Sequence, residues 1–127
     1  MLERIECRAV FHGDPGSGAE VVLYEIGRTV EVIVTVGPSD QLHVHDWVLY
    51  DESDGDMRLY HSADGTGETD NWRMLSRLTT SVGSKFVFPQ PKRTLLLPIG
   101  HKIYAAHDGT TPVMDVIVNV TVLRKSA

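Results

Sequence analysis

The sequence predicts an all-β protein, an antiparallel sandwich or barrel of about eight strands. Apolar and polar residues alternate with a period of two along much of the chain, which is the pattern of half-buried strands. β-Branched residues are concentrated in these stretches, as strands favour. Turn signals rich in Gly, Pro and Asp separate them at short intervals. A length of 127 residues is that of one domain, so we expect a single domain over 1–127.

The alternation is clearest at the two ends of the chain. At one end, Ile5, Cys7 and Ala9 alternate with charged residues, and 1–11 is expected to be a first strand or an N-terminal arm. At the other, every second residue from Met114 to Val122 is apolar, so this row is expected to face inward. The expected strands are, in order, 2–11, 19–26, 28–36, 41–50, 57–61, 85–88, 93–97, 101–107 and 113–123.

The stretch 41–50 is apolar on both faces. Strict alternation places Leu42, Val44 and Val48 on one face of this strand, and His43, His45, Trp47 and Leu49 on the other. Asp54-Gly55 follows as a strong hairpin signal and leads into 57–61.

The segment 67–81 departs from the strand pattern. Asp70 is a suitable N-cap for a short helix near 70–78 that would contain Trp72, Met74 and Leu78. An irregular crossover loop is the alternative.

Composition excludes several classes of protein. The chain has 17 acidic and 12 basic residues and a net charge of −5, which argues against nucleic acid as a partner. No apolar run approaches the roughly 20 residues of a membrane-spanning helix. The first residues carry charges where a signal peptide needs an apolar core, so we expect no secretory signal. A single cysteine, Cys7, allows no internal disulfide and is expected to be a buried thiol.

The best candidate for chemistry is the stretch from Gly37 to His45. A glycine, five residues and then His-x-His resemble the first motif of the cupin family. His43 and His45 would share a strand face and could bind one metal ion, with His101 or His107 as a third ligand. Two further ligands of the cupin set are missing or misplaced here, so polar residues at a surface or interface are the favoured interpretation of the two histidines.

Other signals for chemistry are weak. The acidic stretch 51–56 fails the spacing of a calcium-binding EF-hand loop, so a solvated turn is the better interpretation. No nucleophile elbow, phosphate-binding loop or dinucleotide fingerprint is present, so we expect a protein that is not an enzyme and carries no cofactor. Aromatic residues offer one alternative, the sugar-binding platform of a carbohydrate-binding module on a tail fibre, built from Trp47, Trp72, Tyr50, Tyr60 and Tyr104.

The segment 27–123 resembles small jelly-roll structural proteins of tailed bacteriophage virions, a family that includes capsid decoration (cement) proteins, head fibres and tail-associated domains. The resemblance rests on the glycine turn and alternating strand of 26–32, the 49–55 strand and turn, the Leu95 to Ala106 stretch with its Pro98-Ile99-Gly100 turn, and the valine-rich last strand. These motifs recur in many sandwiches, and the family has no invariant catalytic residue. The resemblance implies a jelly-roll fold and a non-enzymatic role.

The resemblance leads us to expect a capsid decoration protein that forms a homo-oligomer, a trimer by analogy, and bridges neighbouring subunits of the major capsid protein. Its location would be the virion, assembled in the host cytoplasm, with no membrane or nucleic acid among its partners. The expected interface residues are apolar or aromatic side chains with two arginines as polar anchors: Leu2, Ile5, Trp47, Trp72, Arg73, Arg77 and Phe88. The alternatives are a small cupin-like metal protein that uses His43 and His45, and the carbohydrate-binding module.

Overall fold

The computed structural model describes residues 2–27, 36–80, 85–87, 95–110 and 112–125. The regular structure of these residues is almost entirely β-strand, as predicted, with one short 3-10 helix, η1 (Asn71–Arg73). The strands are β1 (Leu2–Gly13), β2 (Ala19–Glu20), β3 (Val22–Glu25), β4 (Gln41–Asp51), β5 (Gly55–Ser62), β6 (Met74–Thr80), β7 (Lys85–Val87), β8 (Leu95–Leu96), β9 (Lys102–His107) and β10 (Met114–Lys125).

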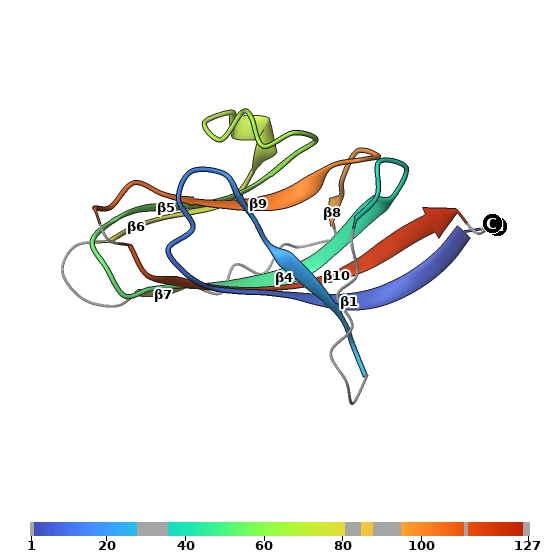
Figure 1. Cartoon of the computed structure of the whole chain (residues 1–127), viewed down its shortest axis with the longest axis horizontal. Coiled ribbons are helices and arrows are strands. Elements are labelled where there is room, and N and C mark those ends of the chain that lie inside the picture. Colours follow the sequence, from blue (N-terminus) through green and yellow to red (C-terminus); the bar gives the residue numbers. More distant parts are fainter. Residues whose placement is uncertain (1, 28–35, 81–84, 88–94, 111, 126–127) are drawn as a thin grey trace.

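The strands form two antiparallel sheets that face each other (Figure 1). The larger, sheet A, has the order β3-β1-β10-β4-β7, with β8 also pairing with β4, and the smaller, sheet B, has the order β2-β9-β5-β6. Strands early in the chain therefore pair with strands late in the chain, as in one long hairpin that is folded around the core. The pairs are β1 with β10, β2 with β9, β4 with β7 and β5 with β6. This is the jelly-roll arrangement that the sequence resemblance implied.

The core lies between the two sheets. The row from Met114 to Val122 faces inward, as predicted, and each member is at most 1% exposed. On β1, Cys7 and Ala9 are fully buried, and Ile5 packs against the core at the margin. Residues 2–11 thus belong to a strand of sheet A, which pairs with β10 along its whole length. Most of the expected strand 28–36 lies outside the described residues.

A β-bulge in β4 changes the predicted faces of that strand. Val44 pairs with Val120 and Asp46 pairs with Asn119, so His45 is an extra residue with no partner of its own. The bulge puts His45 and Asp46 outside in succession, and Trp47 then points inward, where it is 3% exposed. The prediction that Trp47 and Leu49 share a face with His43 and His45 is therefore wrong, because it assumed an uninterrupted ladder.

Two other local predictions are wrong. Asp54-Gly55 makes a turn, but it connects β4 of sheet A to β5 of sheet B and so closes no hairpin. The helix near 70–78 is reduced to the single 3-10 turn η1, and residues 74–80 form strand β6. Asp70 occupies the N-cap position of η1, although its side chain makes no capping hydrogen bond.

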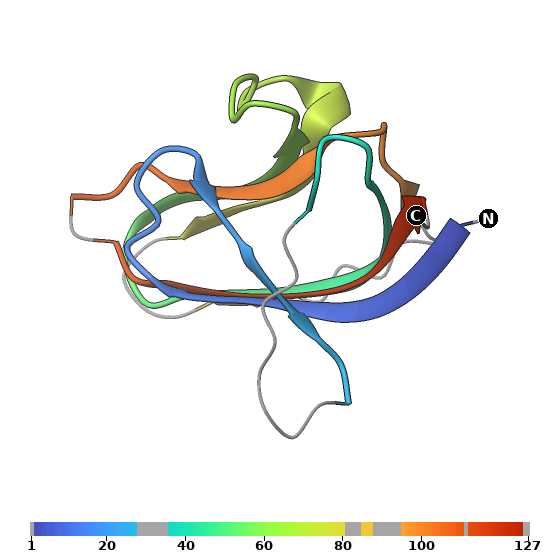
Figure 2. The same cartoon turned by 45° about the vertical axis from the view of Figure 1, so that its right-hand side comes forward.

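The loop between β5 and β6 lies over part of the outer face of sheet B (Figures 1 and 2). Tyr60 and Tyr104 stack on this face with ring centroids 5.6 Å apart. The Tyr60 hydroxyl donates a hydrogen bond to the Gly65 carbonyl, 2.8 Å away, and Arg73 donates to the Thr66 carbonyl at 2.7 Å. Part of the outer face of sheet B is therefore covered by the chain itself. No helix in the described part of the chain is long and apolar enough to cross a membrane.

Candidate functional site

The expected interface residues do not gather on one surface. Leu2 and Trp72 are both 60% exposed, but Leu2 begins β1 in sheet A and Trp72 belongs to η1 beside sheet B. Trp47 is buried in the core, so it has no surface to offer a partner, which corrects its place in the expected set. Ile5 is half-buried against the core, and Phe88 lies outside the described residues.

The two expected arginine anchors are already engaged within the chain. Arg77 donates to both carboxylate oxygens of Asp56, with distances of 2.6–3.0 Å. The Arg73 guanidinium lies 4.7 Å from the centre of the Trp72 ring and also contacts Thr66 and Ser62. It covers one of the two ring faces on which a sugar would have to stack, which weakens the carbohydrate-platform hypothesis at its one exposed tryptophan.

A row of apolar side chains crosses four strands on the outer face of sheet A. Val10 of β1 pairs with Val22 of β3 on one side and with Ile117 of β10 on the other. Ile117 pairs in turn with Val48 of β4, so the four β-branched side chains lie next to one another. Val22, Val10 and Ile117 are 36%, 39% and 38% exposed, and Val48 is half-buried. We call Val22, Val10, Ile117 and Val48 the apolar row.

Polar side chains flank the apolar row on both sides. On one side Arg8 donates to Asn119 at 3.3 Å, and Asn119 donates to Asp46 at 2.6 Å. On the other side His12 contacts Asp115. An apolar strip between two polar margins has the anatomy of a protein interface, where a dry centre is surrounded by a polar rim.

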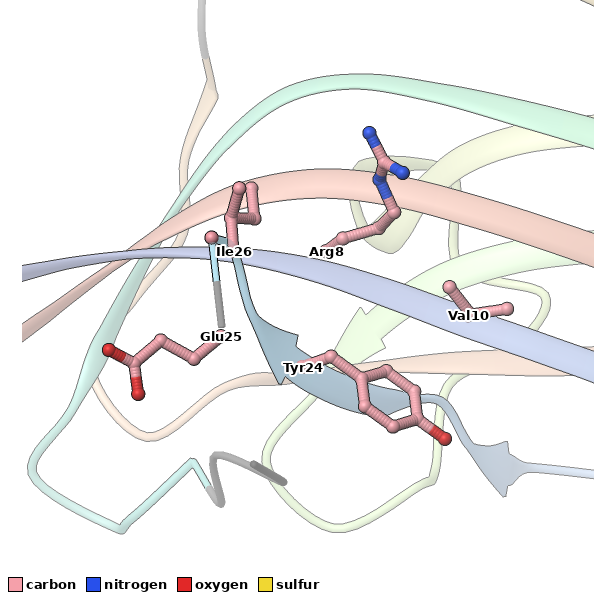
Figure 3. Close-up of a pocket in the computed structure, with 6 residues that line it drawn as sticks. Arg8, Val10, Tyr24, Glu25 and Ile26 are labelled. Carbon is pink, nitrogen blue, oxygen red and sulfur yellow. The ribbon is translucent and has the colours of Figure 1, made fainter. Parts of the chain in front are cut away.

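An open hollow adjoins the apolar row at the edge of the sheet. It has a volume of about 340 Å³ and is lined by Arg8, Val10, Tyr24, Glu25, Ile26 and Gly27. Figure 3 shows Arg8 and Val10 on β1 beside Tyr24 on β3, with Ile26 beyond them. Ile26 is 46% exposed, so the hollow extends the apolar surface toward the strand edge.

The sequence contained a signal for this surface. Val10 is in phase with the outward Arg8, and Ile117 is in phase with the outward Asp115 and Asn119. An apolar residue at a position that the alternation assigns to the outer face predicts an exposed apolar side chain there. The cross-strand register that aligns these spots comes from the structure.

The four histidines of the metal hypothesis do not converge. His43 and His45 lie on the outer face of sheet A, with ring centroids 5.3 Å apart, and His45 bonds to Thr121. His101 lies beside His61, and His107 is buried next to Asp51. Among the residues described, no three His, Cys, Asp or Glu side chains are placed to hold a metal ion. The geometry thus gives the cupin-like site no third ligand.

His61 and His101 form a cluster with Trp72. Their Nδ1 atoms are 2.9 Å apart, and His61 Nε2 is 3.2 Å from the Trp72 carbonyl oxygen. The Trp72 ring centroid lies 5.5 Å from that of His61 and 6.1 Å from that of His101. Burial lowers the pKa of both histidines below their ordinary value of 6.5, so both rings are neutral at pH 7. The sequence analysis did not pair them.

A serine, a histidine and an aspartate meet at the opposite end of the sandwich, but not as a catalytic triad. His107 Nε2 is 3.0 Å from Asp51 and 3.5 Å from the Ser53 hydroxyl, so both contacts fall on the same ring nitrogen. A triad needs the acid and the nucleophile on different nitrogens. His107 Nδ1 accepts a hydrogen bond from the Gly109 amide, so this ring ties two turns together.

The remaining candidates are structural. Burial raises the pKa of the Cys7 thiol to about 11, which leaves it protonated and unreactive. In the acidic stretch 51–56, Asp51 turns toward His107 while Asp56 is held by Arg77, so these carboxylates do not share a cation.

The chain was also compared with known proteins. No protein-family model, curated protein or solved structure matches it.

Proposed function

We propose that this chain is a non-enzymatic structural protein that attaches to other protein surfaces through the outer face of sheet A, in the manner of a capsid decoration protein of a bacteriophage head. The single observation that carries the proposal is the apolar row across β3, β1, β10 and β4. The jelly-roll topology supports it, because that fold recurs in viral capsid proteins. The resemblance of the sequence to virion proteins supports the capsid setting.

The free energy of one such contact determines how the protein would attach to its partner. Covering a valine or isoleucine that is about 38% exposed contributes on the order of 1 kcal/mol. Three such side chains then supply about 3 kcal/mol, which corresponds to a contact weaker than about 1 mM. One copy would therefore bind only weakly. A homo-oligomer that presents several copies of the face at once multiplies weak contacts into firm attachment, which is why we propose a multimer, with a trimer as the first expectation.

The opposite side of the sandwich is less suited to the role. The loop between β5 and β6 and the paired residues Arg77 and Asp56 already occupy the outer face of sheet B. A partner there would have to displace contacts that stabilise the chain itself. Sheet A presents its apolar row without such a cover among the described residues.

The experiment compares the wild type with Ile117→Asp. Heads assembled without this chain are mixed with each purified protein, and bound protein is measured by co-sedimentation and heat resistance by the temperature of DNA release. We expect the wild type to bind and raise the release temperature, and Ile117→Asp to do neither. Ile99→Asp is the matched control, since Ile99 is 65% exposed in the turn before β9 and its substitution adds the same charge away from the row.

Sedimentation velocity of the same proteins gives the second readout. The wild type is expected to form an oligomer at assembly concentrations. A wild type that neither binds heads nor raises their heat resistance would refute the capsid role. Equal binding by Ile117→Asp and the wild type would refute the role of the apolar row.

A further inference from the structure

The histidine pair at the end of sheet B has a geometry that the proposed function does not use. His61 lies in β5 and is 5% exposed, whereas His101 lies in the turn before β9 and is half-buried. The backbone brings them together because His61 pairs with Ile103, two residues beyond His101. Their Nδ1 atoms are 2.9 Å apart, which is hydrogen-bond distance.

The hydrogen bonds assign the protons on both rings. The Trp72 carbonyl oxygen can only accept, so His61 Nε2 carries the proton and donates across 3.2 Å. A neutral ring has one proton, so His61 Nδ1 presents a lone pair toward His101. His101 Nδ1–H then donates to it, and the half-buried His101 ring keeps Nε2 as its acceptor.

We propose that His61 and His101 form a two-histidine site for a divalent transition-metal ion of the zinc, nickel and copper class, bound by Nδ1 of both rings. Metal–nitrogen bonds of about 2.0–2.1 Å place two ligand nitrogens about 2.9 Å apart at a right angle and about 3.3 Å apart at a tetrahedral angle. The observed separation lies at the lower end of this range. The separation of the two nitrogens therefore fits a shared ion, and each ring has to turn so that its Nδ1 lone pair points at the ion instead of at the other ring.

Binding leaves the number of protons unchanged. The proton of His101 leaves Nδ1 and a proton is taken up at Nε2, so both rings stay neutral and two Nδ1 lone pairs face the ion. No oxidation or reduction is involved, and water completes the coordination.

The hydrogen bond from His61 to Trp72 is the second reason to assign a metal to this pair. Histidines that bind metal ions generally donate their other ring N–H to a carbonyl or carboxylate, which fixes the ring orientation. His61 already has this arrangement, with Nε2 held by a backbone carbonyl and Nδ1 directed at a second imidazole. His43 and His45 are closer in sequence, but Nε2 of His45 is bonded to the Thr121 hydroxyl at 2.7 Å.

Two protein ligands make a site of moderate affinity. Arg73, which stacks on Trp72, places a positive charge nearby and opposes the ion. Asp64 on the same loop brings a negative charge that favours the ion, although its Oδ1 atom already accepts hydrogen bonds from Ser62 and Thr66. We therefore expect an exchangeable ion that is bound in the micromolar range.

The test uses the whole chain, without an affinity tag, titrated with Zn²⁺ by calorimetry and with Cu²⁺ by quenching of tryptophan fluorescence. We expect one ion per chain and quenching by Cu²⁺, since Trp72 lies beside both rings, with recovery on addition of a chelator. His101→Gln is expected to weaken binding by at least about tenfold. His45→Gln is the matched control, an exposed histidine of sheet A that should leave binding unchanged.

His101→Gln is the decisive variant because His101 is less buried than His61, and its thermal unfolding is measured alongside to show that it folds. His61→Gln removes a buried side chain and is used only if it also melts cooperatively. The assignment is overturned if the wild type binds neither ion, or if folded His101→Gln binds as tightly as the wild type. Loss of binding in His45→Gln would move the site to the other sheet and equally overturn it.

Discussion

Arg124 near the end of β10 holds the buried carboxylate of Asp40 at the start of β4. The Arg124 Nη2 atom lies 2.9 Å from Asp40 Oδ2, and Nε lies 3.1–3.2 Å from both carboxylate oxygens. Asp40 Oδ2 also accepts the Gly37 amide at 2.8 Å, and the Asp40 carbonyl accepts the Gly100 amide at 2.8 Å. One aspartate thus joins the 37–40 turn, the turn at Gly100 and the last described strand.

This pair predicts an acid-sensitive contribution to stability. The hydrogen bonds from Arg124 lower the pKa of Asp40 below its ordinary value of 3.8. A lowered pKa in the folded state contributes stability above about pH 4 that is lost as pH falls below 3.8. Asp40→Asn should therefore cost about 1–3 kcal/mol at pH 7, and the deficit should shrink toward pH 2.

Urea unfolding of wild type and Asp40→Asn between pH 2 and 7 measures this effect. Glu52→Gln removes an exposed carboxylate and should follow the wild-type curve. A deficit that stays constant across this range would show that the pairing with Arg124 is not its source.

The two tryptophans should differ sharply in their contribution to stability. Trp47 is 3% exposed within the core, so Trp47→Ala is expected to lower the free energy of unfolding by about 3–5 kcal/mol. Trp72 is 60% exposed, so Trp72→Ala should change it by no more than about 0.5 kcal/mol. Chemical denaturation of both variants measures the difference. Similar losses in the two would contradict the inward turn of β4 at the bulge.

Gly55 should be irreplaceable for reasons of space. A Cβ at this position would lie 2.5 Å from the His107 ring, and its backbone φ is +142°. Gly13 has a similar φ of +127° with no atom within 4 Å of the added Cβ, so Gly13→Ala measures the backbone strain alone. We expect Gly55→Ala to cost about 1–3 kcal/mol more than Gly13→Ala in thermal or urea unfolding. Equal costs would indicate that His107 moves aside freely.

Cys7 should react with thiol reagents only when the chain unfolds. Its pKa of about 11 leaves little thiolate at pH 8, and the side chain is fully buried. Labelling with a disulfide reagent such as DTNB at pH 8 is expected to be slow in buffer and fast in denaturant. Rapid labelling in buffer would indicate that β1 detaches from the sheet. Cys7→Ala, which has no thiol and keeps the pairing of β1 with β10, is the matched control for the labelling signal.

The sequence predicted the fold class because apolar and polar residues alternate wherever a strand is regular. The row from Met114 to Val122 and the pair Cys7 and Ala9 are buried as the period of two requires. At His45 the bulge adds one residue, and every later side chain of β4 then changes face. Nothing in the local sequence marks that insertion, because it is set by the register against β10.

Other errors share this cause. The spacing between Met74 and Leu78 fits one face of a helix, but pairing with β5 made the segment a strand, with a bulge between Met74 and Ser76. Asp54-Gly55 identified a turn but not which strands it joins. For the candidate surfaces, exposed Trp72 and Leu2 were predicted, whereas the apolar row and the contact of His61 with His101 depend on residues far apart in sequence.

The pairing of β1 with β10 also bears on how the chain reaches its fold. Twelve residues of the first strand lie against a strand that leaves the ribosome about one hundred residues later. The centre of sheet A therefore cannot form until β10 has been synthesised, and until then β1 lacks this partner strand, with Cys7, Ala9 and Phe11 uncovered. Folding should be slow, because it depends on pairing between strands far apart in sequence, and a chain shortened within β10 would lose the central strand of sheet A.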